Sequence, residues 1–92
     1  MLKIHKYPIR IEREQLVEMP VGAKILSIRE VRGELVMWTL AEVNIAQCSR
    51  RIAMIGTGDP FSETLPGAFI NTVLLNDYLV CLHFFDAGEV HS

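Results

Sequence analysis

The chain has 92 residues, of which 50% are hydrophobic, and a formal net charge of −2 at pH 7. This apolar content is enough for one small core and excludes a disordered chain, while the acidic balance argues against nucleic acid as a partner. No apolar run approaches the ~20 residues of a membrane-spanning helix and no signal-peptide pattern opens the chain, so we expect a cytoplasmic protein with no membrane partner.

The N-terminal part predicts short strands separated by turns. Residues 2–7 alternate apolar and polar side chains, and Pro8 ends that strand or places it at a sheet edge. The alternation continues through residues 9–14. Residues 15–19 form a short extended piece that ends at residues 20–22, where proline and glycine are typical of a turn.

A hairpin is predicted in the middle of the chain. Residues 23–31 and 34–40 are apolar strands on either side of Arg32-Gly33, and a glycine in so short a connection favours a tight turn. Trp38 lies in the second strand, where we expect it to be a core side chain. Residues 42–49 fit either a turn of helix or an irregular loop, and we favour the loop. Residues 50–55 predict a strand.

The C-terminal part predicts a second hairpin. Apolar runs over residues 67–75 and 78–85 surround the pair Asn76-Asp77, which predicts a two-residue turn. The apolar content of both runs indicates a hairpin that is largely covered in the folded protein. Residues 61–66 are expected to form a loop, and residues 86–92 a flexible tail.

These elements amount to about seven short strands at a spacing of ~8–12 residues, with no sustained helical period. The pattern predicts an all-β fold for a single domain over residues 1–92. Two architectures fit: a small antiparallel sandwich, or a partly open barrel, built from hairpins.

One loop carries the strongest signal for a ligand. Two glycines flank a hydroxyl after the strand over residues 50–55, so that backbone N–H groups can approach an anion. The candidate site residues are Arg50, Arg51, Gly56, Thr57, Gly58 and Asp59. The competing interpretation is a strand-exit turn beside solvated arginines, because Pro60 follows where a phosphate loop would begin a helix.

The histidines and cysteines do not predict a reactive site. No Cys and His spacing suits a zinc ion, and Cys81 and His83 lie within the apolar run LVCLHFF, which favours an inert thiol and a satisfied interior or interface histidine. No disulfide between Cys48 and Cys81 is expected. Since no pair of carboxylates suits acid–base work, we expect no catalytic residue, metal or cofactor, and no enzymatic activity.

Short motifs spread over nearly the whole chain resemble a family of short, uncharacterised proteins encoded in bacteriophages and prophages. They are Lys6-Tyr7-Pro8, Met19-Pro20-x-Gly22-Ala23-x-Ile25-Leu26, Trp38, Gly56-Thr57-Gly58-x-Pro60 and Leu79-Val80…His83-Phe84-Phe85. The chain departs from this pattern over residues 43–48, where relatives more often have a polar loop, and in the extension 86–92. The resemblance implies a phage-encoded accessory protein, with no enzymatic activity that carries over.

Three hypotheses for function follow. The first is a non-enzymatic accessory protein that acts by binding a host protein, such as a defence or regulatory component. The second is a small-ligand protein that holds a nucleotide or another phosphate-containing signal at the turn of residues 56–58, and the third is a minor structural or assembly protein of a virion. In addition, the apolar half of a 10.4 kDa chain and its strand edges predict a homo-oligomer.

Overall fold

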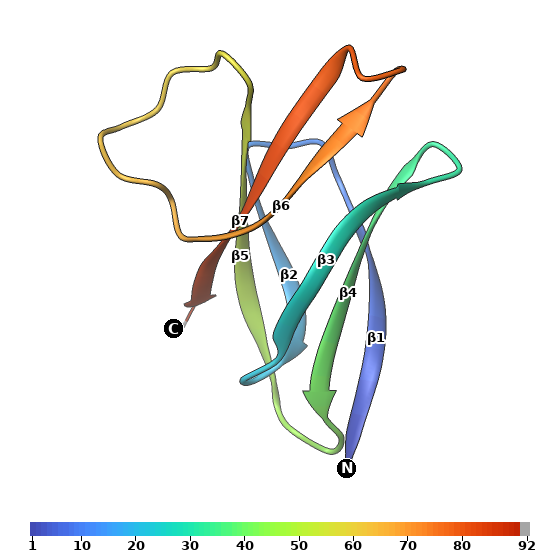
Figure 1. The fold of residues 1–92 in the computed structure, drawn as a ribbon. Coiled ribbons are helices and arrows are strands. Elements are labelled where there is room, and N and C mark those ends of the chain that lie inside the picture. The colour runs from blue at the N-terminus through green and yellow to red at the C-terminus, as the bar shows by residue number, and fades with distance from the viewer. Residues whose placement is uncertain (91–92) are drawn as a thin grey trace.

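Short alternating segments broken by proline and glycine turns form seven strands in the computed structural model, which describes residues 1–90 (Figure 1). The strands are β1 (Leu2–Ile9), β2 (Glu14–Pro20), β3 (Lys24–Val31), β4 (Glu34–Glu42), β5 (Gln47–Gly56), β6 (Ala68–Leu75) and β7 (Val80–Val90). They pair into two antiparallel sheets, β1-β4-β3 (sheet A) and β2-β5-β7-β6 (sheet B). The all-β prediction is confirmed, as a two-sheet sandwich that is not closed into a barrel. Within residues 1–90, no helix is long and apolar enough to cross a membrane.

The core lies between the two sheets and is built from alternate residues of each strand. On β4, Leu35, Met37 and Thr39 are buried, while the residues between them are only partly covered. The core cluster comprises Ile9, Met19, Ala23, Ile28, Leu35, Met37, Ala41, Ile52, Val73, Leu82 and Phe84. Both sheets contribute to it, so folding of either sheet depends on the other.

Trp38 lies on the opposite face of β4 from this core. Side chains of a strand alternate between its two faces, so with Met37 and Thr39 buried, Trp38 faces outward, where it is half-buried among its strand neighbours. The prediction that Trp38 is a core residue is therefore wrong. Every residue from Leu35 to Leu40 except Thr39 is apolar, so the sequence alone did not show which face is inside.

Two carboxamide side chains form hydrogen bonds with backbone N–H and C=O groups that strand pairing leaves without a partner. Asn71 on β6 accepts a hydrogen bond from the Ile28 N–H of β3 (2.8 Å) and donates one to the Ile28 carbonyl (2.7 Å). Gln15 on β2 does the same to Arg10, at 3.0 and 2.8 Å. β3 and β6 are edge strands of different sheets that lie side by side, and Asn71 links them by mimicking a neighbouring strand.

Both predicted hairpins are confirmed, but the second differs in its turn. Arg32 and Gly33 both have positive φ (52° and 86°) and connect β3 to β4 as a two-residue turn. Between β6 and β7 the last pair is Leu75 with Val80, so that residues 76–79 form the loop. Three consecutive residues of this loop, from Asn76 to Tyr78, have positive φ, and the predicted two-residue turn is wrong.

The second hairpin is also less covered than its composition suggests. Phe69 and Leu74 on β6 are 57% and 46% exposed, and Leu79 at the tip is 86% exposed. β6 is an edge strand whose outer face has no second layer above these positions. Apolar content therefore predicted the strands correctly but not their burial.

Two segments that the sequence predicts to be irregular are partly strand. β4 extends to Glu42 and β5 begins at Gln47, so the loop is limited to residues 43–46. β7 continues through residues 86–90, with Glu89 opposite Arg50 on β5, and the prediction of a flexible tail is wrong for these residues. Polar residues at the end of β7 are held in the sheet because they pair with a buried cation. Residues 91–92 lie outside the described residues.

We predict that Asn71→Asp destabilises the fold by about 1–3 kcal/mol, the usual effect of leaving buried polar groups unpaired. The aspartate keeps the size and the acceptor for the Ile28 N–H, but it places a carboxylate against the Ile28 carbonyl. Urea unfolding followed by the fluorescence of Trp38 measures the change, with Asn71→Ala as a second variant. An unchanged midpoint in both variants would show that the link between β3 and β6 contributes nothing.

Candidate functional site

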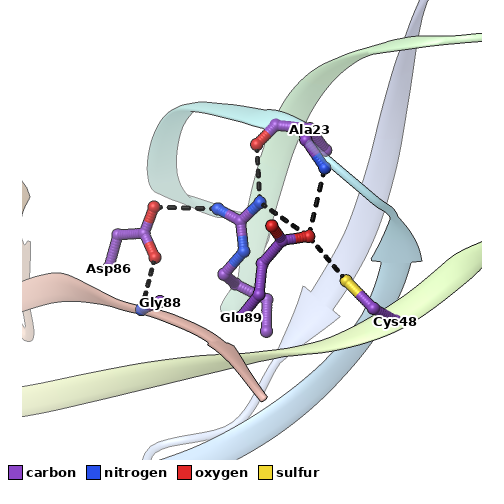
Figure 2. Close-up of polar contacts among 7 residues, drawn as sticks. Ala23, Cys48, Asp86, Gly88 and Glu89 are labelled. Atoms are coloured by element: carbon purple, nitrogen blue, oxygen red, sulfur yellow. Dashed lines mark hydrogen bonds and ion pairs between the residues drawn. The ribbon is translucent and has the colours of Figure 1, made fainter. Parts of the chain in front are cut away.

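Arg50 is buried inside the sandwich rather than available to a ligand. Its Nη1 lies 2.9 Å from Asp86 Oδ2, and its Nη2 donates a 2.8 Å hydrogen bond to the Ala23 carbonyl (Figure 2). The carboxylate of Glu89 is 4.0 Å from the same Nη2. With 5% of its surface exposed, Arg50 serves as an internal cation that joins β5, β7 and the β2–β3 turn.

Glu89 extends this cluster to a cysteine. Its Oε2 accepts hydrogen bonds from the Gly22 N–H (3.1 Å) and from the Cys48 thiol (2.8 Å) (Figure 2). This hydrogen bond, together with partial burial and the charge of Glu89, raises the pKa of Cys48, although Arg50 acts in the opposite direction. The thiol therefore stays protonated near neutral pH, which is the reverse of what a nucleophilic cysteine needs.

Arg51 faces the other side of β5. Its Nε lies 2.7 Å from Glu14 Oε1, in a pair whose side chains are 46% and 59% exposed. Neighbouring residues of a strand point to opposite faces, so Arg50 and Arg51 cannot act on one ligand together. Of the two, only Arg51 is accessible.

The glycine turn after β5 is stabilised by hydrogen bonds between its own residues. The Asp59 N–H donates to the Gly56 carbonyl (3.0 Å), and the Gly56 N–H donates to Asp59 Oδ2 (3.2 Å). Gly58 has a φ of 89°, as a turn glycine requires, and the Thr57 N–H bonds to the Cys81 carbonyl at 3.1 Å. The Asp59 carboxylate therefore occupies the position that an external anion would take.

The six predicted site residues fall in three separate places. Arg50 and Gly56 are six residues apart on one strand, about 20 Å at the usual rise. The structure thus brings together the four residues of the turn, but it places neither Arg50 nor Arg51 with them.

His83 links this turn to the sheet. Its Nε2 lies 2.8 Å from the Thr57 hydroxyl, its Nδ1 lies 2.8 Å from the Thr72 hydroxyl, and Cys81 Sγ is 4.0 Å from Nε2. Both ring nitrogens are thus engaged by hydroxyl groups. The side chain is satisfied, as its sequence context suggested, but it lies on the outer face of sheet B, in register with Thr72.

The outer face of sheet A is an apolar surface that spans all three strands. The register places Ile4 of β1 opposite Leu40 of β4, with Val36 and Trp38 next along β4. Leu26 lies at the β3 irregularity beside Trp38. Ile4 is 60% exposed and Leu26 41%, while the three β4 side chains are half-buried.

Basic side chains border this surface. Lys6 lies opposite Trp38, and on β3 Lys24 lies opposite Leu40 and Arg29 opposite Val36. Glu42, at one end, is paired with the N-terminal amine at 2.8 Å. The sequence did not predict this surface, because its residues come from three strands. The signal that could mark it is the group of basic residues around the apolar ones, and they are seen to share a face only when the strand register is known.

The whole chain matches one family. The family described as "Domain of unknown function (DUF7352)" matches residues 1–92, so the chain belongs to it. Comparisons with the curated proteins and with the solved structures found no match.

We predict that Arg50→Met destabilises the protein by about 3–5 kcal/mol, because it leaves two partly buried carboxylates without their cation. Arg51→Met is the matched control on the same strand, and it is expected to change stability by less than about 1 kcal/mol, as for an exposed ion pair. Chemical denaturation of both variants measures the difference. Equal effects would contradict the structural role of Arg50.

Proposed function

We propose that this DUF7352 protein is a non-enzymatic accessory protein that acts by binding another protein through the outer face of sheet A. The observation that carries the proposal is the apolar surface around Trp38, which is framed by basic side chains. Contiguous apolar surface rimmed by polar residues is typical of protein-binding sites. A tryptophan at the centre of such a surface is the residue type that most often dominates binding energy.

The charges around the surface favour a particular kind of partner. Lys6, Lys24 and Arg29 border the apolar residues. Of the two acidic side chains on the same face of β4, Glu42 is paired with the N-terminus, and Glu34 lies at the opposite end of the strand, next to Val31 of β3. A partner with apolar side chains flanked by aspartate or glutamate complements this surface. A second copy of the chain would bring the same three cations against these, so we assign the surface to a different protein.

The resemblance to bacteriophage and prophage proteins supports a phage-encoded protein that works in the cytoplasm of a bacterial host. A host defence or regulatory component is then the proposed target. The hydrogen bonds of the two side chains that could suggest catalysis also support a mode of action by binding. The Cys48 thiol donates a hydrogen bond to Glu89, and both ring nitrogens of His83 are hydrogen-bonded to threonine hydroxyls.

A charge placed on the surface tests this function. Proteins captured from a bacterial lysate are identified, purified and titrated against the protein, with the fluorescence of Trp38 as the signal. We predict that Ile4→Glu lowers the affinity at least tenfold, because it adds a like charge against an acidic partner and removes an exposed apolar contact. Leu74→Glu is the matched control, since Leu74 is also exposed on a strand but belongs to sheet B.

Lys24→Glu is expected to weaken the same complex, and reversal of the facing acidic residue of the partner should restore it. Equal affinity of the parent and the Ile4→Glu variant, with unchanged melting temperatures, would contradict a role for this surface. A captured protein that does not rebind after purification would also count against the proposal.

Self-association stays a prediction, and we place it at the strand edges. β1 and β2 each have a paired neighbour on one side only within the described residues. Such edges can pair with those of a second copy. We expect light scattering at tens of micromolar to give twice the 10.4 kDa chain mass, and a monomer there would contradict the prediction.

A further inference from the structure

The loop between β5 and β6 encloses a cleft against the outer face of sheet B. In Figure 1 this loop, residues 57–67, makes a wide excursion from the end of β5 before the chain returns to β6. The cleft has a volume of about 330 Å³. Its lining includes Arg13, Arg51, Ala53, Phe61, Ser62 and Thr64. This is large enough for a small molecule, at the lower end of the range for ligand sites.

The floor of the cleft belongs to a part of the outer face that is already shielded from water. Ala53 is 7% exposed although it faces away from the core, and Phe85, opposite it on β7, is 4% exposed. Phe85 packs edge-on against Phe69, with ring centroids 5.7 Å apart. On the loop side of the cleft, Phe61 keeps 55% of its surface exposed. An apolar floor and an aromatic wall suit a flat, weakly polar group.

The rim carries two guanidinium groups with unused donors. Glu14 holds the Nε of Arg51 at 2.7 Å, and within residues 1–90 no partner engages the Nη atoms of Arg51. Arg13 forms no ion pair within the same part of the chain. Ser62 and Thr64 place hydroxyl groups in the same lining. Glu14 thus fixes one arginine while leaving its two terminal nitrogens available to an anion.

We propose that this cleft binds a mononucleotide or a closely similar small phosphate ester with an aromatic ring. Arg13 and Arg51 bind the phosphate through charge-assisted hydrogen bonds. Phe61 stacks on the base, and the hydroxyls of Ser62 and Thr64 contact its polar edge or the sugar. The volume admits one nucleotide unit. This site is separate from the sheet A surface, and of the residues that the sequence singled out for a ligand it contains only Arg51.

Calorimetric titration with AMP, GMP, CMP and UMP tests the proposal, with inorganic phosphate, adenosine and a single-stranded pentanucleotide as comparison probes. We expect at least one mononucleotide to bind more tightly than phosphate or adenosine alone. Arg13→Gln and Arg51→Gln should each reduce that affinity at least tenfold. Arg32→Gln, in the exposed β3–β4 turn of the other sheet, is the matched control and should leave it unchanged.

Phe61→Ala separates the two halves of the site. We expect it to weaken nucleotide binding severalfold while leaving the affinity for inorganic phosphate unchanged, and its melting temperature should match that of the parent because the side chain is exposed. Absence of heat with all four nucleotides would overturn the proposal. So would binding that Arg51→Gln does not alter, or a pentanucleotide that binds more tightly than any mononucleotide. None of these outcomes depends on the protein-binding surface of sheet A.

Discussion

The guanidinium of Arg50 lies on the core side of β5, where an unpaired charge would be strongly destabilising. Its partners come from distant parts of the chain: Asp86 and Glu89 from β7, and a backbone carbonyl from the β2–β3 turn. This one requirement explains why β7 continues to Val90 although its last residues are polar. It also explains why the turn at Gly22 is held against β7, since Glu89 accepts the Gly22 N–H. The end of the sandwich that contains the β2–β3 turn and the last residues of β7 is therefore held together by the charge of Arg50 rather than by apolar packing.

Hydrogen bonds from side chains to unpaired backbone groups hold the sides of the sandwich in a similar way. Asn71 fills the open donor and acceptor of Ile28, and Gln15 does so for Arg10. These carboxamides bind backbone groups that no neighbouring strand pairs. The two small sheets can therefore stay separate without closing into a barrel. The buried polar groups thereby become part of the scaffold. The side chains that remain available for binding lie on the outer faces, around Trp38 on sheet A and beneath the β5–β6 loop on sheet B.

The two outer faces offer different chemistry. The face around Trp38 is apolar with a basic border, which suits a protein surface. The cleft beside Arg51 combines an apolar floor with free guanidinium donors, which suits a small anion that carries a ring. A chain of this size has room for both proposed binding surfaces, because its single core is shared by the two sheets and each sheet leaves its outer face exposed.

Much of the fold follows from local patterns. Alternation, prolines and the Arg32-Gly33 turn predicted the strands and both hairpins, because strand period and turn conformation depend on neighbouring residues. The structure does not assemble the ligand site that the sequence predicted from the two arginines and the turn of residues 56–59. Arg50 and Arg51 point to opposite faces of β5, and Gly56 lies about 20 Å along the strand from Arg50. The face of Trp38 also depended on pairing, since β4 is apolar on both sides. The sequence by itself determined which segments become strands; tertiary structure decided which face is inside, because burial depends on the register between strands far apart in the chain.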